Sequence, residues 1–581
     1  MRSLTLSLMA FAFLPASACA SGLAEGTLSG DYLSGRLAAR VNALEDAARV
    51  YAGAHAAAPG ETSLLKDAFF YHLAAGKAEA AMPYAEALLA QAPNEDDGLA
   101  RAATAAKQIK EGALEEARAT LGGEGGSLFI RSLAFLADVW VEKGLAGPEA
   151  ALKKLASPPP ELFDGFNQYH EGLLASEAGR TDQARAAFEA AVQGHGGPLA
   201  RRAYGALLER VDAAKAREYY AILAFDDGAS RRAARMAEQR LAAGRPSKEF
   251  MGATPAQGAA AAIYSFAAAM IYEAQGERDR ALEAGFRVGE PRFNYPLVWA
   301  RLALYLDPDL DEARLLVGFV LSRYADHEGE AAVLRPIAPS SPYFEQARID
   351  MASGLMSTDR IEEAEQLLKD AIRRDPNGLG LQATLAALYS EQRDHESAVA
   401  TLSKVIDGLG EAPPPDAWRY YVARGASLIE LDRWPEAEID LKRAVTLAPD
   451  EPMALNYLGY SWAERGLYLD QAFTLLEKAI EKAPQSGAIV DSLGWAQYQL
   501  GRYEEAALNL EKAATMEPSD PTITDHLGDV YWRLGRRLEA RYQWERALEL
   551  EPTDVQQASI KSKLAQGLPS EPDKKAADRR E

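Results

Sequence analysis

The segment Ser492–Pro521 reads SLGWAQYQLGRYEEAALNLEKAATMEPSDP, and the segment His526–Asp554 reads HLGDVYWRLGRRLEARYQWERALELEPTD. The second segment keeps the Leu-Gly pair, the alanines and the proline of the first, 34 residues later, while most other positions differ. Repetition of a few small and helix-breaking residues at a fixed interval is typical of a chain built from copies of one structural unit. These two segments therefore predict a repeat array.

In the C-terminal third of the chain the interval is 34 or 35 residues. Each unit has an alanine, a bulky residue four positions later, a second alanine and a closing proline. These residues are Ala437, Leu441, Ala444 and Pro449; Ala472, Leu476, Ala479 and Pro484; Ala506, Leu510, Ala513 and Pro518; and Ala540, Trp544, Ala547 and Pro552. Small residues let two helices cross closely, bulky residues fill the gap to the next unit, and proline ends the second helix. We expect Gly459, Gly494 and Gly528, on the first helix of each unit, to face the alanines of the second.

The same register recurs upstream. It is present at Ala364, Leu368, Ala371 and Pro376; at Ala398, Leu402 and Val405; at Ala184, Phe188 and Ala191; at Ala81, Ala85, Leu88 and Pro93; and at Ala47, Tyr51, Ala54 and Pro59. The repeats are therefore expected to run from about Gly30 to about Gln557.

This pattern resembles the tetratricopeptide repeat, whose 34-residue signature has Leu-Gly, Tyr, Ala-x3-Phe and a closing Pro. The resemblance implies an all-α fold, a right-handed α-solenoid of helix-turn-helix repeats. The segments NYLGYSWAERG and DSLGWAQYQLGRYEEA also resemble exported repeat proteins of alphaproteobacteria, a group without a defined function. That resemblance is specific mainly from about Ala256 to Leu550.

A turn-rich stretch, AAGRPSKEFMGATPAQG at Ala242–Gly258, interrupts the repeats and predicts a seam between two arrays. The expected divisions are a signal peptide at 1–18, a tether at 19–29, an N-terminal array at 30–241, the seam at 242–258, a C-terminal array at 259–557 and a polar tail at 558–581.

The N-terminus MRSLTLSLMAFAFLPASACASG has one cation, a short apolar run and then small residues, which is the layout of a signal peptide. Cys19 is the only cysteine in the chain, and its setting resembles the lipobox of bacterial lipoproteins, in which this cysteine is acylated. The resemblance implies an outer-membrane anchor facing the periplasm, because no aspartate follows Cys19. Ordinary cleavage after Ala18 or Ala20 is the alternative.

The net charge of −22 argues against nucleic-acid binding, which requires a basic surface. No His-Glu-x-x-His, P-loop or G-x-S-x-G motif is present, and the seven histidines are scattered. A lytic transglycosylase would need a Glu-Ser motif in a lysozyme-like domain, but Glu396-Ser397 lies inside a repeat. We therefore expect no catalytic residue, cofactor, metal site or small-molecule substrate.

A solenoid of this kind offers an extended concave surface. Given a period of 3.6 residues, one set of residues on three successive first helices should line that surface. The set consists of Asn456, Tyr460, Asp491, Trp495, Tyr498, Asp525, Asp529, Trp532 and Arg533. Tryptophan and tyrosine supply binding area, and the carboxylates would orient a basic or amide-rich segment. The alternative is that the rings pack between neighbouring helices.

The sequence thus favours a non-catalytic periplasmic scaffold, lipid-anchored through Cys19, that binds an envelope protein or peptide for envelope or secretion-system assembly. A soluble periplasmic binding protein is the alternative, and a peptidoglycan-acting enzyme or its regulator is a weaker one.

Overall fold

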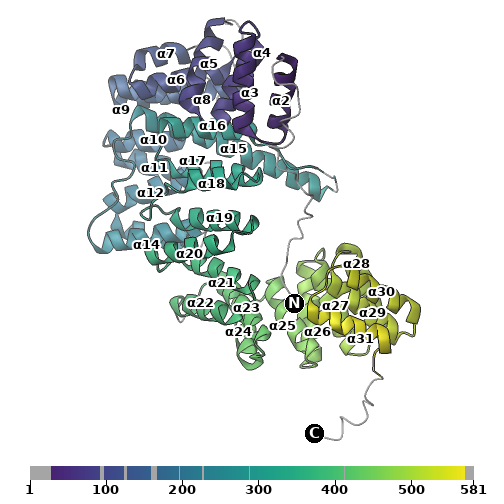
Figure 1. Cartoon of the computed structure of the whole chain (residues 1–581). Coiled ribbons are helices and arrows are strands. Elements are labelled where there is room, and N and C mark those ends of the chain that lie inside the picture. The colour runs from purple at the N-terminus through teal and green to yellow at the C-terminus, as the bar shows by residue number, and fades with distance from the viewer. Residues whose placement is uncertain are drawn as a thin grey trace. The chain divides into compact units, whose positions relative to one another are not determined.

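The computed structural model describes residues 28–91, 97–122, 127–158, 166–194, 196–224, 228–284, 286, 288–410 and 413–569. Within these residues every regular element is a helix, and most helices pair with the next one along the chain (Figure 1). The predicted all-α fold of paired repeats is confirmed. No described helix is long and apolar enough to cross a membrane. The predicted signal peptide and Cys19 lie outside the described residues.

The chain forms two compact units that divide between Leu381 and Gln382. Helices of the N-terminal unit are α2 (Leu28–Arg40), α3 (Leu44–Ala57), α4 (Thr62–Ala74), α5 (Ala78–Gln91), α6 (Gly98–Glu111), α7 (Leu114–Leu121), α8 (Leu128–Ala146), α9 (Pro148–Leu155), α10 (Asn167–Glu177), α11 (Thr181–Gln193), α12 (Gly197–Val211), α13 (Ala213–Leu223), α14 (Gly228–Ala242), α15 (Pro255–Glu283), α16 (Asn294–Leu306), α17 (Asp311–Arg323), α18 (His327–Leu334), α19 (Phe344–Ser357) and α20 (Ile361–Arg374). Helix α21 (Leu379–Glu391) crosses the division.

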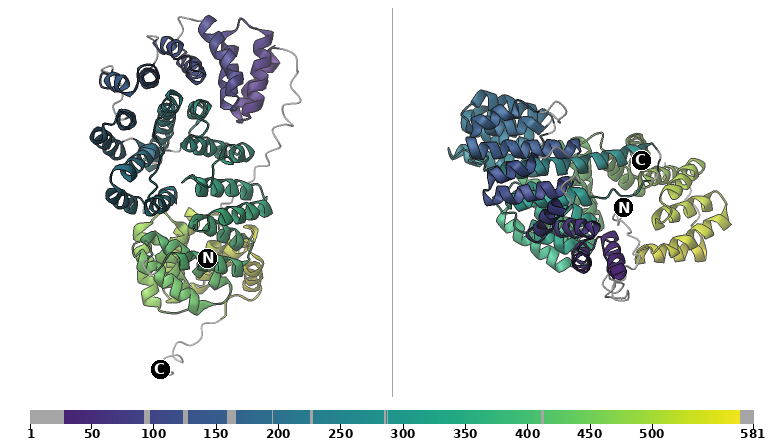
Figure 2. Two further views of the ribbon diagram at one scale, coloured as in Figure 1. Left: turned by 90° about the vertical axis from the view of Figure 1, so that its left-hand side faces the viewer. Right: turned by 90° about the horizontal axis from the view of Figure 1, so that it is seen from above.

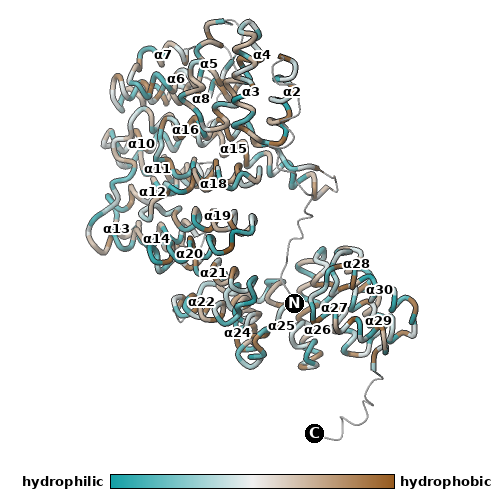
Figure 3. The backbone as a smooth tube through the Cα atoms, in the orientation of Figure 1, coloured by the Kyte–Doolittle hydropathy of each residue, from teal (hydrophilic) through white to brown (hydrophobic). Residues whose placement is uncertain are grey.

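The C-terminal unit continues with α22 (His395–Gly408), a 3-10 turn at Pro415–Ala417, α23 (Trp418–Glu430), α24 (Trp434–Leu447), α25 (Pro452–Glu464), α26 (Leu469–Lys482), α27 (Gly487–Gln499), α28 (Tyr503–Met516), α29 (Pro521–Arg533), α30 (Arg537–Glu549) and α31 (Asp554–Gln566). Hydrophobic and hydrophilic residues are interspersed along the helices (Figure 3), as expected for helices with one buried face and one exposed face.

The first helices of the C-terminal unit lie on the inner side of its curve. Helix α25 packs against α27, and α27 against α29, more closely than the second helices α26, α28 and α30 pack against one another. The register alanines Ala437, Ala472, Ala506 and Ala540 are fully buried. A Cβ on Gly494 would lie 2.7 Å from Leu510 Cγ and 3.4 Å from the carbonyl oxygen of Ala506. The predicted close approach of first and second helix is therefore present.

In the N-terminal unit the long helix α15 and the helix α16 pack against the first helices α4, α6 and α8. The purple and blue helices curve around the teal helices that follow them in the chain (Figure 2). Residues Gly258–Ala262 permit this packing because they are small: a Cβ on Gly258 would overlap the indole of Trp140. The inner side of this unit is therefore filled by its own chain.

Aromatic pairs join the filling helices to the helices around them. Phe129 on α8 meets Phe266 on α15 at 5.0 Å and Trp299 on α16 at 5.6 Å between ring centroids. Phe70 on α4 meets Tyr295 at 5.3 Å. Such pairs stabilise a core beyond the burial of their area.

The division between the units differs from the seam predicted at 242–258. The predicted seam is an ordered connection inside the N-terminal unit: the backbone N–H of Ser247 donates to Glu209 at 2.9 Å, and Lys143 Nζ donates to the carbonyl of Ala253 at 2.8 Å. Arg232 on α14, before the predicted seam, forms an ion pair with Asp375, which follows α20. This ion pair joins a helix that precedes the seam to one that follows it. The repeat pattern is lost there because α15 turns onto the inner face instead of extending the row.

The predicted polar tail also differs at its start, because α31 extends to Gln566. Thr553 and Gln556 form a capping box, and Ile560 is fully buried. Because α31 buries only this one residue, its sequence shows little helical periodicity of apolar residues. Residues 570–581 lie outside the described part of the chain.

We expect Gly258→Ala to destabilise the N-terminal unit by about 1 to 3 kcal/mol, because the new methyl group overpacks the Trp140 contact. Gly276→Ala on the same helix is the control: its nearest neighbour would be Arg280 Nη1 at 3.6 Å, and it should be neutral or stabilising by up to about 1 kcal/mol. Chemical denaturation of both variants checks the difference. Equal stability of the two variants would contradict the proposed role of Gly258.

Candidate partner-binding site

The structure brings the predicted groove residues together on three successive first helices. Asn456, Asp491 and Asp525 are the fifth residues of α25, α27 and α29, and Tyr460, Trp495 and Asp529 are the ninth. Tyr498, Trp532 and Arg533 lie at the helix ends. The common helix positions place the set along the inner face of the C-terminal unit.

None of these nine residues is fully exposed. Asn456, Tyr460, Asp491 and Asp529 are buried, and the others are half-buried: Trp495, Tyr498, Asp525, Trp532 and Arg533. Tyr460 OH donates to Glu464 at 3.5 Å. The inner face is therefore a packed polar wall, in which each side chain is positioned by its neighbours.

His526, which the sequence analysis did not select, links two of the repeats. Its Nδ1 lies 2.9 Å from Asp491 Oδ1, and its ring stacks on Trp495 with 4.0 Å between centroids. Trp495 in turn stacks on Tyr498 at 4.7 Å. Burial alone would lower the pKa of His526, but the charge and hydrogen bond of Asp491 raise it overall. The only hint in the sequence was its position, 35 residues after Asp491.

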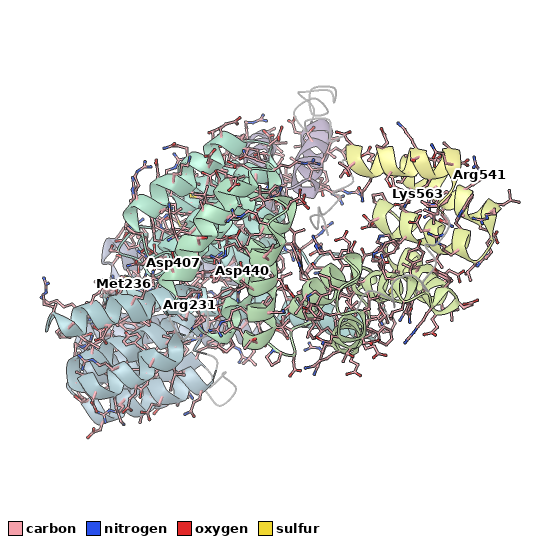
Figure 4. All side chains as sticks on the ribbon, turned by 90° about the horizontal axis from the view of Figure 1, so that it is seen from below. Arg231, Met236, Asp407, Asp440, Arg541 and Lys563 are labelled. Carbon is pink, nitrogen blue, oxygen red and sulfur yellow. The ribbon has the colours of Figure 1, made fainter. Side chains whose placement is uncertain are left out.

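Lys563 on α31, labelled in Figure 4, neutralises the last two carboxylates. Its Nζ lies 2.8 Å from Asp525 Oδ2 and 2.7 Å from Asp529 Oδ2. Trp544 Nε1 donates to Asp529 Oδ1 at 2.9 Å. Burial raises the pKa of Asp529 to about 6, although Lys563 acts in the opposite direction. Lys563 fell in the predicted tail, so the sequence offered no reason to select it.

The chain's own C-terminal segment covers the last repeat. Arg533 donates from Nε to Tyr498 OH at 3.1 Å and from Nη1 to the carbonyl of Pro569 at 2.7 Å. Gly567 packs directly on Trp532, where a Cβ would overlap the indole. Trp532 also lies 5.3 Å from Trp544 and carries Arg537 over its face at 3.8 Å. The ring of Trp532 is therefore engaged internally.

Two polar atoms of the wall have no hydrogen-bond partner in the described structure, namely Asn456 Oδ1 and Trp495 Nε1. One is an acceptor and the other a donor, on neighbouring first helices. Buried polar atoms are rarely left unpaired, because each costs about 1 to 3 kcal/mol. No group of three His, Cys, Asp or Glu side chains that could hold a metal occurs among the described residues. The unused hydrogen-bonding capacity of the wall is therefore one buried acceptor and one buried donor.

Family models described as tetratricopeptide repeat match residues 345–411, 384–452, 422–487 and 492–555. These ranges include eight of the nine predicted groove residues, and the ninth, Asp491, lies directly before the last range.

Two curated relatives are similar to parts of the chain. A TPR repeat-containing protein of Pseudomonas aeruginosa is 29% identical over 192 residues, which are 32% of each chain. A human protein O-mannosyl-transferase is 28% identical over 167 residues, which are 29% of this chain and 19% of the relative. The chain thus spans about a third and about a fifth of the length of these relatives.

Among solved structures, the hetero-tetramer Cut9–Hcn1 of the APC/C is similar over 94% of this chain and 97% of its own, at 14% identity and a TM-score of 0.39. The repeat spacing, the helix pairing and the family matches together identify residues 345–487 and 492–555 as tetratricopeptide repeats.

Proposed function

We propose that this protein is a non-catalytic scaffold that binds an extended segment of a partner protein along the inner face of its C-terminal unit. The observation that carries the proposal is the pair of unpaired polar atoms, Asn456 Oδ1 and Trp495 Nε1, on that face. A peptide backbone supplies both an N–H donor and a C=O acceptor, so one peptide segment can satisfy both buried atoms once their side chains turn toward it.

The N-terminal unit supports the choice of face. Its inner side is occupied by α15 and α16, so a partner cannot use it without displacing a core that includes Phe266 and Trp299. In the C-terminal unit the segment 563–569 covers the face at α29, while the face at α25 and α27 keeps its unpaired atoms. The partner site is therefore centred on α25 and α27.

The charges of the wall favour an amide-rich partner over a basic one. Asp491 is paired with His526, and Asp525 and Asp529 are paired with Lys563. A basic segment would have to break these buried pairs, which costs several kcal/mol because it leaves a charge without its partner. Hydrogen bonding to backbone amides and contact with the Trp495 ring require no such exchange.

The N-terminal sequence supports export. A signal-peptide layout followed by the single cysteine, Cys19, suits acylation and an outer-membrane anchor facing the periplasm. In this setting the scaffold would serve envelope or secretion-system assembly, with its partner an envelope protein.

Asn456→Leu is expected to weaken partner capture at least tenfold and, at the same time, to stabilise the C-terminal unit by about 1 kcal/mol, because it removes a buried acceptor without a partner. Capture is measured by crosslinking and affinity purification from native envelopes with quantitative mass spectrometry, and stability by thermal unfolding.

The control is Thr104→Val in the N-terminal unit, which removes another buried and unpaired oxygen. It should leave capture unchanged. Undiminished capture by Asn456→Leu would show that the inner face of the C-terminal unit is not the binding site.

The stability of the C-terminal unit should fall as the pH rises above about 6.5, the ordinary pKa of histidine, and through the raised pKa of His526 in the folded state. The pKa of His526 is raised in the folded state, so its pairing with Asp491 contributes fully below the unfolded pKa and is lost as the pH rises through the folded one. Thermal unfolding of the wild type and of His526→Gln checks this expectation, and the decline should be shallower in the variant. Parallel curves would argue against a charged pair. The carboxyl of Asp529, with a pKa raised to about 6, titrates mainly below this window.

Cys19→Ser should abolish incorporation of an alkyne-labelled fatty acid that the wild type takes up in the producing cell. Gel fluorescence of the purified proteins gives the readout. A mature wild-type mass beginning at Cys19 or Ser21 without acyl groups would instead favour a soluble periplasmic protein.

A further inference from the structure

A pocket of about 690 Å³ lies in the N-terminal unit over α19, between α18 and α20. Volumes of 300 to 1,000 Å³ are usual for small-molecule sites. The pocket involves neither the C-terminal unit nor any of the nine predicted groove residues.

The pocket exists because α18 is short. It has 8 residues, against 14 in α20, and it ends before Arg335-Pro336, where proline cannot continue the helix. The buried guanidinium of Arg348 holds this end in place by donating to the carbonyls of Leu334 at 3.2 Å and Ile337 at 2.8 Å. Since these bonds fix the end of α18, the opening is a built feature of the fold.

The acidic residues of the lining are already satisfied. Their partners are Arg360 for Glu328 and Glu363, Arg373 for Asp370, and the backbone N–H of Gly329 for Asp326. These carboxylates therefore do not neutralise the remaining cations of the pocket.

Three arginines of the lining, Arg335, Arg348 and Arg374, have no ion-pair partner among the described residues. Arg335 and Arg374 are exposed and have no carboxylate within ion-pair distance among the described residues, and Arg348 is 7% exposed. The pKa of Arg348 is lowered, first by burial and then by the charges of Arg374 and Arg335. The mutual repulsion shows that the three charges share one neighbourhood without a counterion from the protein.

His327 also lines the pocket, but its ring is engaged internally. Its Nδ1 lies 3.1 Å from Glu330 Oε2 and its Nε2 lies 3.1 Å from Ser357 Oγ. Ser357 Oγ donates its proton to the carbonyl of Gly354 at 2.9 Å. This hydrogen-bonded chain fixes the orientation of the ring.

The other walls are apolar. Phe344 and Met351 are buried at the base, and Leu355, Leu367 and Ala371 line the sides. The pocket therefore combines an apolar surface with positive charge at its rim.

We propose that this pocket binds an amphiphilic anion, whose carboxylate or phosphate group lies between Arg335 and Arg374 and whose apolar body lies on Leu355 and Leu367. Guanidinium groups match the geometry of both acidic groups. The site is separate from the partner-binding face of the C-terminal unit, so it adds a second kind of ligand to the scaffold.

Isothermal titration calorimetry of the full chain with octanoate, octyl phosphate and octanol tests the proposal. At least one of the two anions should bind, and octanol should bind at least tenfold more weakly. Binding of only octanoate or only octyl phosphate would identify the preferred head group. The double variant Arg335→Gln/Arg374→Gln should lose at least tenfold in affinity, and it should fold normally because both side chains are exposed.

Lys369→Gln is the matched control, since Lys369 lies on α20, pairs with Glu365 at 2.5 Å and does not line the pocket. It should bind as the wild type does. The proposal is overturned if neither anion binds, if octanol binds as tightly as the anions, or if the double variant binds as the control does.

Discussion

The close crossing of paired helices is the constraint on which the structure depends. Gly494 meets Leu510 and the backbone at Ala506, and Gly528 meets Trp544 in the same way one repeat later. At such distances a side chain on the first helix would push the pair apart, and the next repeat would lose its packing surface. Because each repeat stacks on its neighbour, this local requirement recurs along the chain and places the first helices on the inner side of the C-terminal unit.

The N-terminal unit also depends on small residues where two helices cross closely, but there the close crossing has a different result. Gly258 and the alanines after it let α15 approach Trp140 on α8, and α15 then lies on the inner face with α16. The inner face of the N-terminal unit is therefore part of its hydrophobic core and not a free surface. The two units therefore differ in what their inner faces can do, although both are made of paired helices, and the proposed partner site lies in the C-terminal unit.

Most polar side chains on the inner face of the C-terminal unit pair with other side chains of the same unit. His526 and Lys563 neutralise three carboxylates, and the stacked rings of His526, Trp495 and Tyr498 hold one another in place. The wall is therefore rigid, and only a few of its polar atoms have no hydrogen-bond partner. Such a surface suits recognition of a partner's peptide backbone more than recognition of a charged side chain. Three arginines without an ion-pair partner among the described residues line the pocket over α19 in the N-terminal unit, where a shortened helix leaves room for a ligand.

The sequence by itself determined the repeat length, the helix pairing, the ends of the second helices and the positions of the wall residues, because small residues and prolines act locally and recur at a fixed interval. Only the tertiary structure decided that Asn456 and Asp491 are buried, that His526 and Lys563 complete the wall, and that α31 belongs to the fold. It also decided that α15 fills an inner face and that the units divide at Leu381. These features come from contacts between different helices, such as that of Lys563 with Asp525, and a periodic pattern carries no information about which distant surface a helix will meet.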